Sequence, residues 1–293
     1  MAIYHFSAKV ISRSAGSSAV ASAAYRSAER LHDDRLDRHH DFTNKAGVVH
    51  SEVMLPDGAP ERLGDRSSLW NEVEATELRK DAQLSREVEF AIPRELNQQQ
   101  GIELARDFVS REFVERGMVA DLNVHWDMGA DGLAKPHAHV MLTMREVHED
   151  GFGAKVREWN RSELVCDWRE RWADHVNERL ASLDIDARID HRSLEAQGIG
   201  LQPQTKIGAP SLRMGAAADR LIEHHAIARE NGERIIANPD IALDAITKQQ
   251  ATFTRRDLAM FVHRHSDRKE QFDLALNAVQ SSPNLISLGM DGR

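Results

Sequence analysis

Two strand-like runs separated by a turn-rich segment place the strongest constraint on how this chain can fold. The first run, residues 121–126, contains His125, and the second, residues 136–142, contains His137 and His139. Side chains alternate between the two faces of a strand, so residues two apart project from the same face. The segment between the runs is rich in glycine and other turn formers, which favours a hairpin. We therefore expect three imidazoles to converge across one hairpin.

Three neutral imidazoles can bind a divalent metal ion and leave coordination positions open for a substrate, as catalytic metal sites do. The chain has 15 histidines, so most of them must have other roles. His263 and His265 are also two residues apart, but they follow a helical pattern, in which this spacing turns the side chains about 200° from each other. We expect that second pair to be solvated.

Composition favours a soluble globular protein of a reducing compartment. Of the 293 residues, 41% are hydrophobic, and Cys166 is the only cysteine, which excludes a disulfide framework within the chain. The sequence has no run of about 18 apolar residues and no signal peptide, so we expect a cytoplasmic location and no membrane insertion. The formal charge of −9 argues against nonspecific coating of nucleic acid. DNA binding would have to depend on a local site.

The order of predicted elements indicates an α+β fold, with a central, largely antiparallel sheet and helices packed on it. Residues 3–11 are expected to form a central first strand, and Asn97 with Gln100 resembles a capping box that begins a helix. Further strands are predicted over residues 48–56 and 86–93, and helices over residues 19–31, 69–84 and 162–183. We place a domain boundary near residue 210, between a catalytic domain, residues 1–210, and a mostly helical extension, residues 211–293.

The chain has only two tyrosines, Tyr4 and Tyr25. Tyr4 is most simply a packed residue of the first strand. Tyr25 lies in an alanine-rich helix that follows a Gly/Ser loop, where short neighbouring side chains leave the phenol accessible. A tyrosinate can attack a phosphodiester, but its ordinary pKa of about 10 demands activation. A divalent cation contributes to that activation by polarising the phosphoryl oxygens, so Tyr25 is the candidate nucleophile.

Several ordered segments resemble the MobA/MobL relaxases of mobilisable and conjugative plasmids. These segments are residues 3–9, 18–26 and 86–93, the set His125, His137 and His139, and residues 190–199. The histidine set resembles that of nucleases with a histidine-hydrophobe-histidine motif, in which Ala138 is the hydrophobe. The resemblance extends over roughly residues 1–210. The rest resembles the stretch that leads into a helicase portion in TraA-type relaxases of rhizobial and agrobacterial plasmids.

This resemblance implies a palm-like relaxase fold and nicking of one DNA strand at a plasmid origin of transfer, with Tyr25 bound covalently to the 5′ phosphate and later religation. It implies that the three histidines bind a divalent ion, Mg²⁺ or Mn²⁺, and that Glu87 or Glu89 orients the site, of which we favour Glu89. Arg26 and Arg30 are candidates to bind flanking DNA phosphates. The implied partners are single-stranded DNA of the origin, relaxosome accessory proteins and a type IV secretion coupling protein.

Three alternatives stay open. A rolling-circle replication initiator or a transposase would use the same chemistry, but these proteins often place the tyrosine after the histidines, whereas Tyr25 precedes His125. A three-histidine metal hydrolase would attack with a bound water and form no covalent link. A DNA-binding module without enzymatic activity would use the metal only to stabilise its fold.

Overall fold

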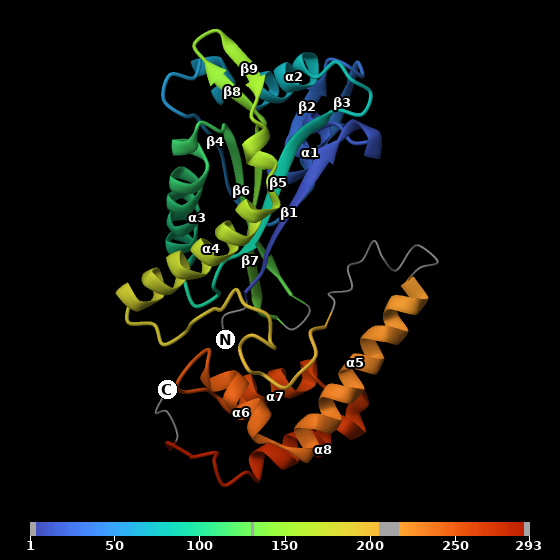
Figure 1. Cartoon of the computed structure of the whole chain (residues 1–293), viewed down its shortest axis with the longest axis vertical. Helices are drawn as coiled ribbons and strands as arrows, with labels where there is room; N and C mark the ends of the chain where they lie inside the picture. Colours follow the sequence, from blue (N-terminus) through green and yellow to red (C-terminus); the bar gives the residue numbers. More distant parts are fainter. Residues whose placement is uncertain (1–3, 130–131, 205–216, 290–293) are drawn as a thin grey trace. The chain divides into compact units, whose positions relative to one another are not determined.

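A computed structural model describes residues 4–129, 132–204 and 217–289, and for residues 217–219 the backbone alone (Figure 1). The chain divides into two compact units between Leu183 and Asp184. The boundary predicted near residue 210 lies outside the described residues. Ile199 and Leu201, which precede it, pack into the hydrophobic core of the second unit.

The first unit is built on a five-stranded sheet with the strand order β1-β5-β7-β6-β4. Every pairing in it is antiparallel, which confirms the predicted α+β class. The predicted hairpin is β6–β7, and β7 is the central strand. Strand β1 lies at an edge of the sheet, so the expectation of a central first strand is wrong. The strands are β1 (Phe6–Ser12), β4 (Val48–Met54), β5 (Gln83–Ala91), β6 (Ala120–Met128) and β7 (Ala134–Leu142).

The two faces of this sheet differ in polarity. One face is apolar, and there Phe90 of β5 packs against Trp172 with ring centroids 4.2 Å apart, while Phe108 packs against both. Phe108 belongs to α3 (Gln98–Glu112) and Trp172 to α4 (Ser162–Ser182), which lie together beside the sheet (Figure 1). The opposite face carries histidine and carboxylate side chains, and α1 (Ala19–Ser27) packs near it. The fold thus places the polar residues of β5, β6 and β7 under α1.

Helix ends show where local sequence signals succeed and where they fail. The predicted capping box is present, because Asn97 Oδ1 accepts the Gln100 N–H at 2.9 Å and Gln100 Oε1 accepts the Asn97 N–H at 3.0 Å. Helix α1, predicted to extend to Leu31, ends at Ser27, since Ala28 adopts a left-handed φ of 58° and its N–H caps the helix. The segment that follows turns into strand β2 (Arg30–Asp33), which carries Leu31.

The helix predicted over residues 69–84 is also shorter. Helix α2 (Arg66–Thr76) begins after Asp65, whose side chain accepts the Ser68 N–H at 2.8 Å. Leu84, the last residue of the predicted helix, instead buries its side chain from β5. An apolar run can match the period of a helix or that of a strand. Here β5 pairs with β1 on one side and with β7 on the other, so the run forms a strand.

The remaining elements of the first unit are short. Strands β2 (Arg30–Asp33) and β3 (Arg38–Asp41) form one hairpin, and β8 (Arg145–His148) and β9 (Gly151–Lys155) form another. The 3-10 helices are η1 (Arg13–Ala15), η2 (Glu61–Gly64), η3 (Val114–Arg116) and η4 (Arg157–Asn160).

The second unit is helical, as expected. Its helices are α5 (Ala217–Ala237), α6 (Asp240–Thr247), α7 (Arg255–Arg264) and α8 (Arg268–Gln280). They enclose their own core, which includes Ile235, Ile246, Val262 and Val279. His265 at the end of α7 is only 8% exposed, so the expectation that both histidines of the second pair are solvated is wrong. No helix in the described part of the chain is long and apolar enough to cross a membrane.

Candidate metal centre and nucleophile

The structure brings His125, His137 and His139 together on the polar face of the β6–β7 hairpin. His125 lies directly opposite His137 in the register of the two strands, and His139 follows two residues along β7. The three ring centroids are 4.8 to 5.1 Å apart. One nitrogen from each ring lies within 4.8 Å of the others, which is close enough for the three to share one ion.

Each of these histidines also has an oxygen atom within hydrogen-bond distance of its other ring nitrogen. The distances are 2.7 Å from His125 Nε2 to Arg26 O, 2.9 Å from His137 Nδ1 to Lys135 O and 2.8 Å from His139 Nδ1 to Glu87 Oε1. A carbonyl or an ionised carboxylate can only accept, so each of these nitrogens carries the proton. The lone pairs remain on His125 Nδ1, His137 Nε2 and His139 Nε2. Three neutral imidazole donors with fixed tautomers fit a divalent metal ion.

Burial keeps two imidazoles of this site neutral, those of His125 and His137. It lowers the pKa of His125 to about 3 and also lowers the pKa of His137. A metal ion and a proton compete for the same lone pair. At neutral pH these two rings therefore offer their lone pairs without first having to lose a proton.

Glu87 is a fully buried carboxylate that connects the histidines to α1 and β1. It accepts hydrogen bonds from His139 Nδ1 and from Arg26 Nε, the latter at 2.6 Å, and Lys9 Nζ lies 3.0 Å away. Burial opposes ionisation, but the hydrogen bonds from His139 and Arg26 outweigh it and hold the pKa of Glu87 well below its ordinary value. An ionised Glu87 fixes the orientation of the His139 ring and makes its Nε2 a stronger ligand for a metal ion.

This geometry differs from the sequence preference for Glu89 as the orienting acid. Glu89 lies directly opposite His139 in the strand register, yet its nearest oxygen is 4.0 Å from His139 Nδ1. Its other oxygen is 3.5 Å from His5 Nε2. The hydrogen bond from His5 lowers the pKa of Glu89 to about 2. Glu87 reaches the His139 ring diagonally, through a side-chain conformation that strand periodicity does not specify.

Helix α1 presents Tyr25 beside the histidines. Ser18 caps the helix by accepting the Ala21 N–H at 3.1 Å, and one side of the helix is buried through Ala19, Val20, Ala23 and Ala24. Tyr25 points away from that side and is 50% exposed. The backbone oxygen of the next residue, Arg26, accepts the His125 Nε2–H. The nucleophile predicted from sequence is thus next in the chain to the residue whose backbone oxygen accepts a hydrogen bond from the histidine cluster.

Lys45 is a residue of this site that the sequence analysis did not single out. Its Nζ lies 4.0 Å from the centroid of the Tyr25 ring and 3.0 Å from the Tyr25 backbone oxygen. Burial lowers the pKa of Lys45. Phe42 packs edge-on against the same ring, with centroids 5.3 Å apart. Lys45 comes from the loop before β4 and belongs to no spaced motif, so only the tertiary fold reveals it.

The two arginines predicted to bind DNA phosphates have different surroundings. The guanidinium of Arg26 pairs with both oxygens of Glu87, and its side chain is only 11% exposed. Its described contacts therefore hold the buried acid in place. Arg30 lies on β2, beyond the end of α1, and is exposed.

Comparisons with known proteins agree with this architecture. The sequence matches the MobA/MobL family over residues 17–216. It is 36% identical to the conjugal transfer protein TraA of Agrobacterium fabrum, with 99% of this chain and 30% of that protein covered. It is also 36% identical to the mobilization protein MobL of Acidithiobacillus ferridurans, with 80% of this chain and 70% of that protein covered. The chain spans less than a third of the length of the TraA relatives.

One solved structure is similar in both sequence and fold. It comes from work on the molecular basis of vancomycin resistance transfer in Staphylococcus aureus, and it is 34% identical with a TM-score of 0.61, covering 66% of this chain and 100% of that one. Strands β4 to β7 of the sheet, the histidine cluster and the tyrosine helix lie within the residues matched to the family, and the chain belongs to the MobA/MobL family.

Proposed function

We propose that this chain is a DNA relaxase that nicks one strand at a plasmid origin of transfer and links the new 5′ phosphate to Tyr25. The observation that carries the proposal is the placement of a half-exposed tyrosine beside three histidines, each of which keeps one nitrogen lone pair free. Relatives named for conjugal transfer and mobilization support a role in DNA transfer. A tyrosine and a metal-binding cluster together suit attack on a phosphodiester.

In the proposed reaction, the phenolic oxygen of Tyr25 attacks phosphorus, and the bond between phosphorus and the 3′ oxygen breaks. The phenolic proton passes to solvent, which the exposed ring reaches, and the departing 3′ oxygen takes up a proton. Because one phosphate ester replaces another, attack by a 3′ hydroxyl on the phosphotyrosine reverses the cleavage and religates the strand.

The residues around the histidines prepare the site for this reaction. A divalent ion, for which we propose Mg²⁺ or Mn²⁺, would polarise the phosphoryl oxygens when bound by His125, His137 and His139. Glu87 orients the His139 ring, and Arg26 keeps Glu87 ionised. Arg26 follows Tyr25 in α1, so its ion pair with Glu87 also connects this carboxylate to the helix that carries the nucleophile.

The same proposal specifies a substrate, a cellular location and partner proteins. The substrate is single-stranded DNA of the origin of transfer, and the chain acts in the bacterial cytoplasm. Relaxosome accessory proteins and a type IV secretion coupling protein are the partners we propose for the transfer process.

The test is covalent capture of a labelled single-stranded oligonucleotide from the origin in the presence of Mn²⁺. We expect a denaturant-resistant protein–DNA adduct with the unmodified chain and with Tyr4→Phe, but none with Tyr25→Phe. An adduct that survives in Tyr25→Phe would refute the assigned nucleophile. Cleavage without any adduct would instead support a metal hydrolase.

A second variant tests the catalytic role of the metal. We expect His137→Ala to suppress nicking, because it removes one of the three free lone pairs. Unchanged nicking in His137→Ala would contradict a catalytic ion at this cluster.

A further inference from the structure

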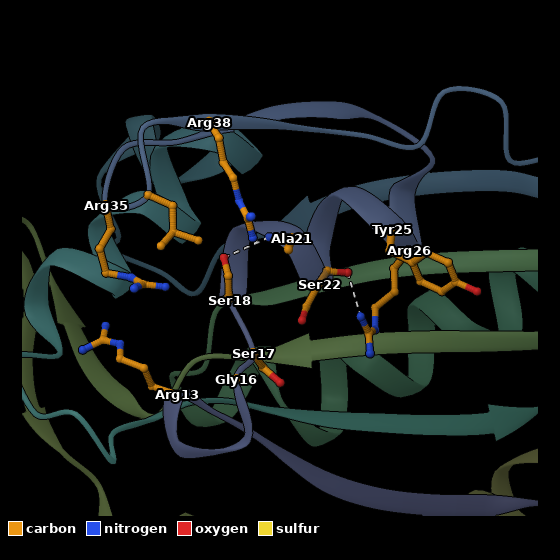
Figure 2. A pocket seen from close by; sticks show the side chains of 11 residues that line it. Arg13, Gly16, Ser17, Ser18, Ala21, Ser22, Tyr25, Arg26, Arg35 and Arg38 are labelled. Carbon is orange, nitrogen blue, oxygen red and sulfur yellow. Dashed lines mark hydrogen bonds between the residues drawn. The ribbon is translucent and has the colours of Figure 1, made fainter. Parts of the chain in front are cut away.

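A cationic pocket of about 450 Å³ extends along α1 from the helix start to Tyr25 (Figure 2). The charged residues of its lining come from three separate parts of the first unit and are all arginines: Arg13, Arg26, Arg35 and Arg38. Among the residues that the structure describes, no acidic side chain lines it. For a chain with a formal charge of −9, this local excess of positive charge indicates an anionic ligand.

Two buried carboxylates balance only part of this charge. Glu74 accepts from Arg13 at 2.6 Å and from Arg35 at 2.9 Å, and Glu87 pairs with Arg26. Arg38 is exposed on β3 and has no ion pair with any described residue. The four guanidinium groups thus share two carboxylates. The N–H groups of Arg38 pair with no acidic side chain among the described residues.

We propose that this pocket binds the nucleotide adjoining the scissile phosphate, with Arg38 and the exposed part of Arg35 contacting its phosphate group. The inference rests on the proposed function and adds the path of the strand to it. Figure 2 shows Arg35 and Arg38 near the start of α1 and Tyr25 farther along it. Tyr25 is the seventh residue after Ser18, which corresponds to a rise of roughly 10 Å along a helix. An adjoining phosphate can therefore sit near Arg38 while the scissile phosphate lies at Tyr25.

The chemistry of the lining suits a nucleotide better than a simple anion. Planar guanidinium forks match the geometry of phosphate oxygens, and Ser17 and Ser22 add hydroxyl groups. Leu36, 37% exposed, gives the same pocket an apolar surface for a sugar or a base. The His125 hydrogen bond to Arg26 O fixes the histidine cluster beside the Tyr25 end of α1. The strand would thus pass from the cluster across Tyr25 into the pocket.

Equilibrium binding of a short fluorescein-labelled single-stranded oligonucleotide, followed by anisotropy, tests this path. The full chain carries Tyr25→Phe so that no covalent step intervenes. We expect Arg38→Ala to weaken binding roughly tenfold at low salt and to reduce the slope of log K against log salt by about 0.7, the contribution of one phosphate contact on a single strand. Arg38→Lys should keep the slope and recover part of the affinity, since it retains the charge without the fork.

Arg157→Ala is the matched control, because Arg157 is another exposed arginine of the same unit and does not line the pocket. Equal affinity and equal salt slope in Arg38→Ala, Arg157→Ala and their parent would overturn the proposal. Arg38-dependent binding of free dTMP with unchanged oligonucleotide binding would overturn it too, since the pocket would then take a free nucleotide.

Nicking assays separate this inference from the proposed function. With Tyr25 intact, we expect Arg38→Ala to raise the KM for the origin oligonucleotide about tenfold with a much smaller change in kcat. If no adduct forms in the unmodified chain while binding still depends on Arg38, the proposed function fails and the pocket stands. If Arg38→Ala forms the adduct with unchanged KM, the pocket assignment fails alone.

Discussion

Two pairs of histidines with the same spacing in the sequence occupy different environments. On β7, His137 and His139 project from one face, with ring centroids 5.1 Å apart, and both meet the ring of His125. On α7, His263 is exposed, while His265, which directly follows the last residue of that helix, is buried. A strand repeats every two residues and a helix every 3.6, so one sequence pattern produces a cluster in the first case and separates the rings in the second.

Both regions nevertheless use burial to keep an imidazole neutral. Burial lowers the pKa of His137 and lowers that of His265 to about 4. His265 Nδ1 donates to Phe261 O at 2.9 Å, and its ring packs on that of Phe261 with centroids 4.4 Å apart. Among the described residues, groups of three metal-binding side chains occur only around His139. A neutral buried histidine becomes a ligand candidate only where other donors converge on it.

The largest expected difference between the two pairs is in metal affinity. His139→Ala removes one of three donors and also leaves Glu87 without that hydrogen bond. We expect Mn²⁺ affinity, measured by calorimetry on the full chain, to fall by more than about 100-fold, beyond the loss typical of an outer partner. His263→Ala should leave the affinity unchanged. Similar losses in both variants would mean that spacing alone, and not strand geometry, predicts binding.

A smaller effect should distinguish the two acids near the strand pair. Glu87→Gln removes the carboxylate that receives the His139 Nδ1–H, so we expect Mn²⁺ affinity to fall by about 10- to 100-fold. Glu89→Gln should cost less, because Glu89 pairs with His5 and lies 4.0 Å from that nitrogen. Thermal melting of each variant controls for loss of the fold. A larger loss in Glu89→Gln would restore the preference drawn from the sequence.

The comparison also explains how much could be predicted from the sequence. The hairpin was predictable because the turn formers and the His137/His139 spacing agree on one local geometry. The helix of Tyr25 was predictable for the same reason, since its alanine run follows a Gly/Ser loop. These features depend on contacts within one hairpin or one helix turn. Where local preferences agree, the fold follows them.

Other features depend on segments that are distant in the sequence. Lys45 reaches the Tyr25 ring from a loop 20 residues away, and Glu87 reaches His139 across 52 residues. The edge position of β1 follows from its pairing with β5, which no local pattern reports. A single sequence shows which residues can form such contacts, but only the packed sheet selects among them.

Each histidine pair encloses one residue, and the two enclosed residues should differ in their tolerance of a larger side chain. Ala138 is fully buried on the apolar face of the sheet, whereas Arg264 is exposed on α7. We expect Ala138→Leu to lower the free energy of unfolding by about 1 to 3 kcal/mol through overpacking. Arg264→Leu should change it by less than about 0.5 kcal/mol. Urea denaturation followed by circular dichroism measures both, and equal effects would show that β7 does not separate a packed face from a polar one.

The smallest expected effect is the acid sensitivity of α7. Because the pKa of His265 is about 4 in the folded chain and about 6.5 in the unfolded chain, the unfolded state binds the proton first as pH falls. The contribution of His265 to stability is therefore complete above about pH 6.5 and is lost progressively toward pH 4. Linkage gives a loss of about 1 kcal/mol between about pH 7.5 and pH 5.5.

Hydrogen exchange of the α7 amides, corrected for the intrinsic pH dependence of exchange, measures this loss locally. His265→Gln should remove the pH-dependent part of the protection, whereas His263→Gln should keep it, because His263 is exposed in the folded chain. If both variants keep the full pH dependence, another group must titrate. If both lose it, the exposed ring contributes as much as the buried one, and burial would not be what distinguishes the two histidines of α7.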